Sequence, residues 1–312
     1  MSGFIFKRLL SSIPTLFGVL TLVFLLIRVV PGDPAIAILG DTASEQALQS
    51  FREQMGLNEP LWNQYLDFLG QLLSGSLGNS MVTGEPVFST VLEVLPHTLQ
   101  LTVFALFIGV LFGVPLGVWS AIRCDTWVDY TCRVISLIGI SFPSFLIAIV
   151  LILIFAIELP WFPVISNPGG SFSSSLYNLV LPGMSLGLLM TAYVMRTSRS
   201  SYLNVSSEDY VRTAKSKGTP RHIVILRHTL RNALIPIVTV VGLYMGLLIG
   251  NSVLTEIVFN RPGLGKLIVL SLNLRDYATL QGLMIVYAFL VVLVNLLTDI
   301  TYGFFDPRVT YS

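Results

Sequence analysis

Six apolar runs, each long enough to cross a lipid bilayer, organise the sequence. A spanning helix needs about 20 apolar residues. Charge-free runs of that size occur in five places, and a sixth lies inside the longer charge-free passage 159–195. The sequence therefore predicts an all-α membrane protein with a single transmembrane domain over residues 1–312. We place its spans near residues 9–30, 98–122, 134–157, 176–195, 232–255 and 277–298.

The first run also has features of a signal peptide, because Lys7 and Arg8 precede it. It is longer than the apolar core of a signal peptide, which has about 7–15 residues. No small-residue cleavage site follows it; the chain continues with Val29-Val30-Pro31-Gly32 instead. We interpret the run as a retained membrane anchor.

Basic residues are divided unequally between the two sets of connections. With the N-terminus in the cytoplasm, the cytoplasmic connections hold 13 of the 18 Lys and Arg residues. These are Lys7, Arg8, Arg123, Arg133, Arg196, Arg199, Arg212, Lys215, Lys217, Arg221, Arg227, Arg231 and Arg308. The opposite side has Arg52, Arg261, Lys266 and Arg275, and Arg28 lies inside the outer end of the first span. The positive-inside rule then predicts that both termini are cytoplasmic.

The extracytoplasmic segment 31–97 is acidic and too long for a plain loop. Its apolar spacing predicts one helix near Ser44–Met55 and another near Leu61–Leu73. We expect a small ordered cap. Two interpretations stay open: a lid that shields the ends of the spans, or a docking surface for an external partner.

The segment 196–231 is the charged passage in the second half of the chain, and its punctuation predicts two short helices. Ser206 followed by Asp209 resembles a capping box, so the first helix is expected to start near Ser207. Gly218 supplies a stop, and Pro220 is placed at the first position of the next helix. Such a unit can contact its own membrane domain on one face and a soluble partner on the other.

Three other interpretations of this segment differ in what the structure around it would have to supply. A basic loop can merely reflect the positive-inside rule, and an amphipathic helix can bind anionic lipid at the membrane surface. A helix-turn-helix that reads DNA would need its own soluble core, which a connection of this length cannot supply. We therefore expect the lipid bilayer as a partner and no nucleic acid.

Composition excludes an ordinary soluble domain. Hydrophobic residues make up 54% of the chain and charged residues only 11%, against about a quarter in a typical soluble domain. The net charge of +1 says nothing about partners. Cys124 and Cys132 form no metal or redox motif, so neither a disulfide framework nor a metal site is expected.

Glycines four residues apart recur in three of the predicted spans. Small residues at this spacing let membrane helices approach closely. The glycines are Gly109, Gly113 and Gly117; Gly183 and Gly187; and Gly242, Gly246 and Gly250. We expect them to pack helices together, and we expect kinks at Pro115 and Pro143.

Two motifs look like catalytic sites but lack the context that chemistry requires. Gly183-Met184-Ser185-Leu186-Gly187 matches a hydrolase nucleophile elbow, yet it lies in an apolar helix rather than on a strand-to-helix turn. Gly263-Leu264-Gly265-Lys266 resembles part of a phosphate-binding loop, but Leu267 replaces the Ser or Thr that binds magnesium. We expect neither a hydrolase nor an ATP site.

Ionisable residues are absent from the middle of all six predicted spans, and Glu158, Glu256 and Asp299 lie only at span ends. Transporters coupled to protons or ions usually keep such residues near mid-membrane. A pump built on this chain would therefore take its energy from elsewhere.

The chain resembles the oligopeptide, dipeptide, glutathione and nickel permeases of bacterial ABC importers along essentially its whole length. The marks, in order, are KRLLSSIPTL, PGDP, GLNEPLWNQY, ISFPSF, DYVRTAKSKG, ILRHTLRNALIP, RPGLGKL, Arg275-Asp276-Tyr277 and Asp306-Pro307-Arg308. In the general pattern for such permeases, E-A-A precedes a glycine by three residues, and placing that glycine on Gly218 puts Arg212, Thr213 and Ala214 at the triplet. Arginine thus stands at the glutamate position, as it does in the peptide branch.

The resemblance implies a type I ABC importer permease fold with a cytoplasmic coupling helix. The chain would be a transport subunit rather than an enzyme, in the bacterial cytoplasmic (inner) membrane. Its partners would be a second homologous permease subunit, two ATPase subunits that hold ATP and magnesium, and an extracytoplasmic solute-binding protein. No cofactor is expected on this chain. The residues assigned to ATPase coupling are Glu208, Asp209, Tyr210, Arg212, Thr213, Ala214, Lys215, Lys217 and Gly218.

Substrate and mode of transport leave alternatives open. Dipeptides or oligopeptides are the first choice, glutathione is close behind, and a nickel chelate is the third. A secondary transporter or channel that works without ATPases is the competing class. Substrate-binding residues are not assigned.

Overall fold

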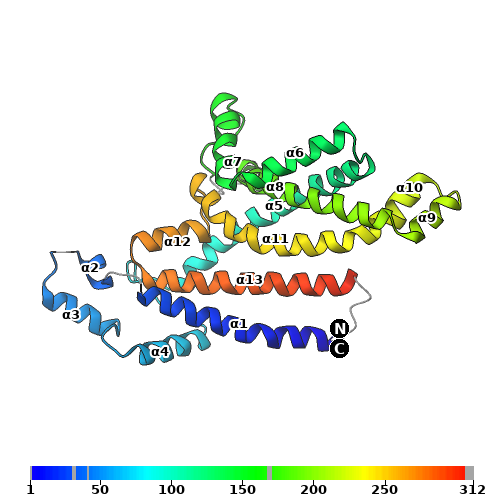
Figure 1. Cartoon of the computed structure of the whole chain (residues 1–312). Helices are drawn as coiled ribbons and strands as arrows, with labels where there is room; N and C mark the ends of the chain where they lie inside the picture. The colour runs from blue at the N-terminus through cyan, green and yellow to red at the C-terminus, as the bar shows by residue number, and fades with distance from the viewer. Residues whose placement is uncertain (1, 30–32, 41, 167–170, 306–312) are drawn as a thin grey trace. The chain divides into compact units, whose positions relative to one another are not determined.

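The structure, a computed structural model, describes residues 2–29, 33–40, 42–166 and 171–305, and every element within them is helical apart from an isolated bridge between Asn79 and Pro86. The helices are α1 (Ser2–Val29), α2 (Pro34–Leu39), α3 (Glu45–Gln54), α4 (Leu61–Leu73), α5 (Val87–Ile122), α6 (Trp127–Ser141), α7 (Ser144–Leu151), η1 (Ile152–Glu158), α8 (Phe172–Ser206), α9 (Asp209–Ser216), α10 (Arg221–Ile223), η2 (Val224–Leu230), α11 (Arg231–Val258), α12 (Leu264–Asn273) and α13 (Tyr277–Phe305) (Figure 1). Among the marks of the resemblance, Pro31-Gly32 and Asp306-Pro307-Arg308 lie outside the described residues.

Five helical stretches are long and apolar enough to cross a membrane. They are Arg8–Arg28, Val87–Ile122, Ser173–Ser206, Arg221–Val258 and Tyr277–Thr301. Three of them extend well beyond the predicted spans, because their polar ends continue the same helix.

The run predicted as a single span near 134–157 is two helices, α6 and α7 with η1, bent by 103°. Pro143 lies at the break, where its ring prevents the helix from continuing. Phe142, just before it, is extended with φ −94° and ψ 129°, as a residue preceding proline must be. The described residues therefore hold five spans, or six if this bent pair counts as one broken span.

The chain divides into two compact units. The large unit comprises Met1–Arg8, His97–Pro262 and Leu293–Ser312, and the small unit comprises Leu9–Pro96 and Gly263–Val292. Three helices, α1, α5 and α13, each contribute to both units. We describe each unit by itself.

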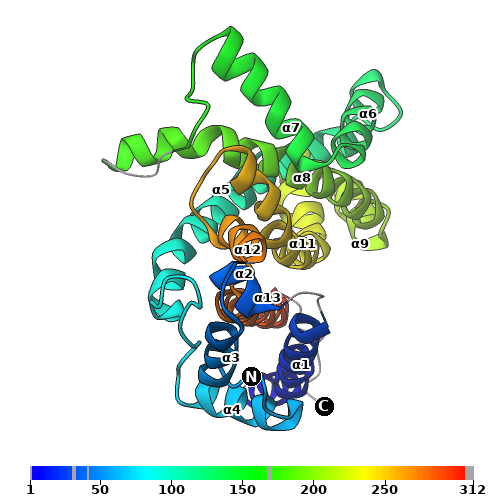
Figure 2. The ribbon, with the colours of Figure 1, turned by 90° about the vertical axis from the view of Figure 1, so that its left-hand side faces the viewer.

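Helix α8 is the centre of the large unit. In its apolar window 72% of the residues are buried, against 17–39% in the other four spans. Helices α6, α7 and α11 all pack on it (Figure 2). Its side chains Leu186, Met190 and Val194 form a buried cluster with Leu101 of α5 and Ile237 of α11.

Small residues bring α5 and α8 together. A Cβ at Gly109 would lie 2.2 Å from the Cγ of Met190, and one at Gly117 would lie 2.4 Å from the carbonyl oxygen of Met195. Glycines of α8 also lie against α5, since a Cβ at Gly183 would lie 2.1 Å from the ring of Phe104 on α5. A Cβ at Gly113 would lie 2.7 Å from Val194 of α8, and one at Gly187 would lie 2.7 Å from Ile108 of α5. Each helix thus presents glycines to the other, the arrangement that lets membrane helices approach closely.

The glycines of the third series, on α11, differ in whether another helix lies against them. A Cβ at Gly242 would lie 2.0 Å from the Cγ2 of Thr298. At Gly246 and Gly250, no described atom comes within 4 Å of such a Cβ. The packing role of these two glycines stays a prediction.

The small unit is built around aromatic side chains of α1 and α4. Phe24 is 1% exposed and packs edge-on against Tyr65, with ring centroids 5.0 Å apart, and on Phe68 at 5.7 Å. Ile285 of α13 completes this cluster. The two helices predicted in segment 31–97 are present as α3, which Ser44 caps through its side chain, and α4.

Two carboxylates fix the loops of the small unit. Asp276 accepts hydrogen bonds from the Ser80 hydroxyl at 2.6 Å and from the Thr279 hydroxyl at 2.7 Å. Asp33 caps α2 and accepts from Arg52 Nη2 at 2.6 Å. Partial burial raises the pKa of Asp33, but the hydrogen bonds from Arg52 and from the Ala35 backbone outweigh it, so the pKa lies below its usual value.

Candidate functional site: a charged helical unit and its buried anchor

The charged passage forms a short helix, α9, which differs at its start from the prediction. Ser206 is the last residue of α8 rather than an N-cap, because α8 runs about three turns beyond the predicted span, which ends at Met195. Glu208 takes the N-cap position of α9 with extended φ and ψ, and Asp209 is in the first turn. A carboxylate there and Lys215 in the last turn both complement the helix dipole.

The end of α9 is the predicted one. Gly218 has φ +74°, a left-handed conformation that costs other residues about 1 kcal/mol or more. Its amide donates to the Lys215 carbonyl at 3.0 Å, and the Thr219 amide donates to the Ala214 carbonyl at 3.2 Å. These two bonds are those of a Schellman motif, which satisfies carbonyls at the end of the helix. We call Glu208–Gly218 the coupling unit.

The second helix of the passage is not short. Pro220 precedes it as the N-cap residue rather than occupying the first helical position, and α10, the π-helical η2 and α11 continue as one stretch, Arg221–Val258. Within η2 the Thr229 hydroxyl donates to the Val224 carbonyl at 3.1 Å, five residues back. The coupling unit is thus joined directly to a membrane-spanning helix on either side.

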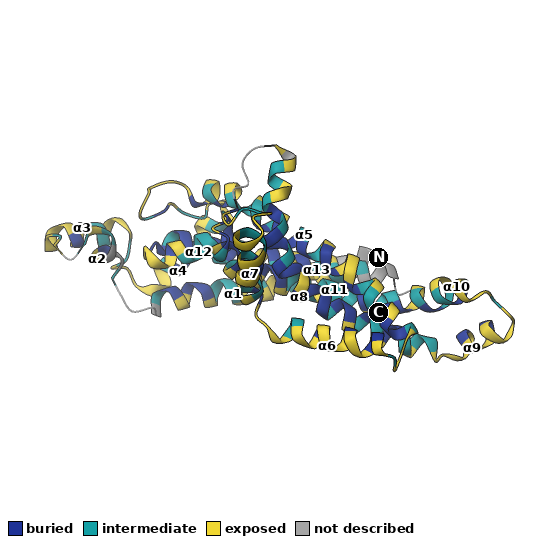
Figure 3. Cartoon of the chain, turned by 90° about the horizontal axis from the view of Figure 1, so that it is seen from above, coloured by how far each residue is buried: buried dark blue, intermediate teal, exposed yellow. Residues whose placement is uncertain are grey.

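The coupling unit has one buried and one exposed face. Val211 is 0% exposed and Ala214 is 8% exposed, so this edge lies against the protein. The other eight residues assigned to ATPase coupling from the sequence are exposed (Figure 3): Glu208, Asp209, Tyr210, Arg212, Thr213, Lys215, Lys217 and Gly218. All nine residues assigned from sequence therefore lie in the coupling unit. Among these nine, Ala214 alone is buried.

A hydrogen-bond relay ties α9 to the stretch that follows it. Asn232 Nδ2 donates to the Tyr210 hydroxyl at 2.6 Å, and the Tyr210 hydroxyl donates to the His228 carbonyl at 3.3 Å. Asn232 and His228 were not identified from sequence. They lie four residues apart and are therefore neighbours on their own helical stretch, but no signal in the sequence pairs them with Tyr210.

The charges on the exposed face are open to a partner. Arg212 Nη1 lies 4.0 Å from Asp209 Oδ1, and the side chain of Arg212 is 71% exposed while that of Asp209 is fully exposed. A solvated pair at this distance contributes little to stability. Recognition of another protein can therefore use these side chains without dismantling the fold.

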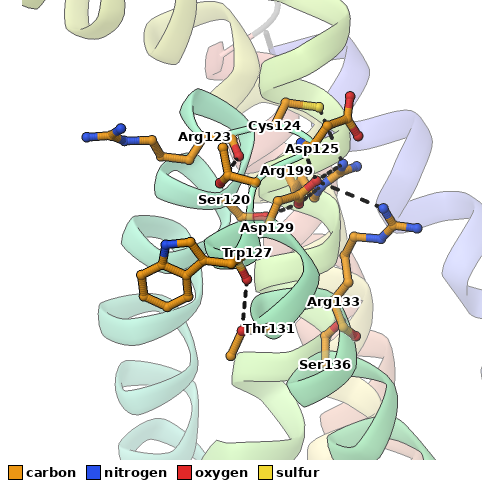
Figure 4. Close-up of polar contacts among 11 residues, drawn as sticks. Ser120, Arg123, Cys124, Asp125, Trp127, Asp129, Thr131, Arg133, Ser136 and Arg199 are labelled. Atoms are coloured by element: carbon orange, nitrogen blue, oxygen red, sulfur yellow. Dashed lines mark hydrogen bonds and ion pairs between the residues drawn. The ribbon is translucent and has the colours of Figure 1, made fainter.

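A buried ion pair fixes α8, the helix that leads into the coupling unit (Figure 4). Asp129 is 0% exposed, and its two oxygens accept from Arg199 Nε at 2.6 Å and Nη2 at 2.7 Å. The Ser120 hydroxyl donates to the same carboxylate at 2.6 Å, and the Asp125 amide donates at 3.1 Å. One side chain thus joins the end of α5, the start of α6 and α8. A bidentate arginine–carboxylate pair of this kind is geometrically specific.

The same cluster does not have the chemistry of a metal site. Ligand atoms of Cys124, Asp125 and Asp129 lie within 4.8 Å of one another. Arg199 occupies both oxygens of Asp129, and its Nη2 also lies 3.7 Å from the Cys124 sulfur. A fixed cation in that position opposes a second one, so we interpret the cluster as an anchor.

The two motif look-alikes lie in helix α8 and at the start of helix α12. Ser185 lies inside α8, is 0% exposed and donates its hydroxyl to the Pro182 carbonyl at 2.7 Å. The Ser185 hydroxyl is therefore enclosed within α8. Gly263 precedes α12, whose first residue, Leu264, is 0% exposed.

Long apolar helices around one buried helix, with a charged helical unit carried between two spans, define a multi-pass helical membrane protein. Two family models match the chain: "Binding-protein-dependent transport system inner membrane component" over residues 113–311, and the N-terminal model of the same type of membrane component over residues 1–102. The chain belongs to this family of transport permeases.

Curated relatives match over their whole length. The chain is 40% identical to the dipeptide transport system permease protein DppB of Alkalihalophilus pseudofirmus, with 100% of both chains covered. It is 39% identical to the glutathione transport system permease protein GsiC of Escherichia coli, again with 100% of both covered.

Solved structures share the fold. A chain of the inward-facing MetNI methionine ABC transporter aligns with a TM-score of 0.58 at 15% identity, covering 70% of this chain and 96% of that one. A chain of an amino acid ABC transporter aligns with a TM-score of 0.55 at 14% identity, covering 69% and 94%. The permease fold expected from sequence is therefore confirmed, while similarity at this level concerns the fold alone.

Proposed function

We propose that this chain is the permease subunit of an ATP-driven importer of short peptides in the bacterial cytoplasmic membrane. Its N- and C-termini and its coupling unit face the cytoplasm. A second homologous permease completes the membrane domain, two ATPase subunits bind ATP and magnesium, and an extracytoplasmic solute-binding protein delivers the substrate. This chain binds no cofactor of its own.

The coupling unit is the observation on which the proposal rests. Its exposed face carries both signs of charge, its other face is buried through Val211, and its ends run into α8 and α10. A docked ATPase that moves α9 would therefore act on two membrane helices at once. Such an element suits a machine whose energy comes from a separate soluble subunit.

The peptide substrate rests on the relatives, one named a dipeptide permease and another a glutathione permease. Both names describe short peptides with free carboxylates. The unequal distribution of basic residues supports the proposed orientation, because 13 of 18 fall in the connections assigned to the cytoplasm.

Uptake into proteoliposomes tests the proposal. Vesicles that contain this chain, its partner permease and both ATPases should accumulate radiolabelled dialanine only with ATP on the ATPase side and the binding protein on the other. Vesicles that contain this chain alone should accumulate none. ATP-independent accumulation by the chain alone would contradict the proposal and favour a secondary transporter or channel.

A further inference from the structure

The small unit contains a cavity of about 810 Å³, which none of the roles above uses. Cavities of this size, a few hundred to about a thousand Å³, hold small molecules. Its walls come from the end of α1, from α4, from the loop 76–81 and from the start of α13. Three of its lining residues, Arg28, Tyr277 and Asp67, have polar groups to which no described residue of the chain is bonded.

Arg28 is a half-buried cation that forms no ion pair within the described part of the chain. Its Nε donates to Gln64 Oε1 at 3.0 Å, its Nη1 donates to Gln281 Oε1 at 3.2 Å, and its guanidinium carbon lies 3.7 Å from the centroid of the Phe24 ring. Two amides and a ring orient the guanidinium but do not neutralise it. Among the described residues, Nη2 has no hydrogen-bond partner and no acid forms an ion pair with Arg28.

Tyr277 adds an unsatisfied hydroxyl on the same wall. Its side chain is 92% buried, since its exposed fraction is 8%, yet its hydroxyl has no hydrogen-bond partner in the described part of the chain. Tyr277 and Gln281 are four residues apart on α13, so their side chains are neighbours, and Gln281 holds Arg28. A buried polar group normally has a partner, and leaving one without costs about 1–3 kcal/mol.

A charge of the opposite sign lines the same cavity. Asp67 is exposed, lines the cavity and forms no ion pair with any described residue. It lies three residues after Gln64 on α4, and is therefore next to the amide that holds Arg28. The other two charged lining residues, Asp33 and Arg52, neutralise each other at 2.6 Å.

We propose that this cavity binds a short peptide as a zwitterion, with its carboxylate on Arg28 and Tyr277 and its ammonium group on Asp67. A chain of two or three residues is about 7–10 Å long when extended and carries both charges, so a cation and an anion that line one cavity can each bind one of its ends. Arginine is well matched to a carboxylate because its guanidinium presents a planar fork of donors. The inference rests on the proposed function, in which short peptides reach this side of the protein.

Equilibrium binding of radiolabelled dialanine to the assembled transporter, without its binding protein, tests the site. We expect saturable binding that weakens at least tenfold when the carboxylate is capped as an amide, or when the amine is acetylated. Arg28→Gln should remove the preference for the free carboxylate, and Asp67→Asn should remove the preference for the free amine. Tyr277→Phe, which keeps the ring, should weaken dialanine binding several-fold.

The matched control is Arg275→Gln, which removes an exposed guanidinium of the small unit that does not line the cavity. It should bind dialanine as the native protein does. The absence of saturable binding, or an unchanged carboxylate preference in Arg28→Gln, would overturn the site. If the same native complex still takes up dialanine with its binding protein, only this site fails; if it takes up no short peptide, the proposed function fails.

Discussion

Replacing Arg212 and Lys215 together by glutamate is expected to reduce ATP-driven uptake more than tenfold while ATP hydrolysis continues. Both side chains lie on the exposed face of the coupling unit. Reversing them changes the charge of that face by four and places new anions beside Asp209. Like charges placed in an interface cost several kcal/mol, so a cleft that accepts the native unit should reject the variant.

The fold should survive this change. Arg212 has only a 4.0 Å contact with Asp209, and exposed substitutions of this kind usually alter stability by less than about 0.5 kcal/mol. Uptake and ATP hydrolysis are measured in the same proteoliposomes, with amounts of inserted protein compared. Arg221→Glu with Arg227→Glu is the control, because both side chains are exposed and lie beyond the coupling unit. Unchanged uptake in the first variant, or an equal loss in the control, would show that the charges on α9 do not matter for docking.

The second large effect is expected at the anchor, where Asp129→Asn should destabilise the protein by about 3 kcal/mol. The substitution keeps an acceptor for Ser120 but leaves the Arg199 guanidinium, only 22% exposed, without its counter-ion. Breaking a buried pair from one side typically costs about 3–5 kcal/mol. We expect the lower end because Arg199 is not fully buried.

Thermal unfolding of the purified protein measures this cost as a lower Tm. Asp125→Asn is the matched control, since Asp125 is exposed, lies four residues away, and has a φ of +59°, which asparagine tolerates. Arg199→Lys should fall between the two, because it keeps the charge but loses the two-pronged contact. If Asp129→Asn and Asp125→Asn unfold at the same temperature, Asp129 is not an anchor.

Much of the fold could be predicted from apolar run length alone, because a membrane-spanning helix must satisfy its own backbone. Helices α3 and α4 followed from apolar periodicity, and the end of α9 followed from Gly218. The residues at which helices start or break were harder to predict. The sequence predicts an N-cap at Ser206, but α8 continues past its apolar part through Ser198 and Ser201, which are buried against the protein.

The site was predictable only where it is local. The coupling unit is one continuous stretch, so its residues could be assigned together. Asp129 and Arg199 are 70 positions apart, and nothing in the sequence pairs them. The cavity around Arg28 was missed for the same reason, since Gln281 lies 253 positions away.

Contact between the coupling unit and an ATPase subunit is the central claim, and site-specific photo-crosslinking tests it most directly. A photoreactive amino acid in place of Thr213, which is exposed on α9, should crosslink to an ATPase subunit when the assembled complex is illuminated. The same amino acid in place of Trp62, 66% exposed on α4 in the small unit, should not. If the ATPase is present in the complex but no crosslink forms from position 213, or if both positions crosslink to it equally, the coupling unit is not the docking element.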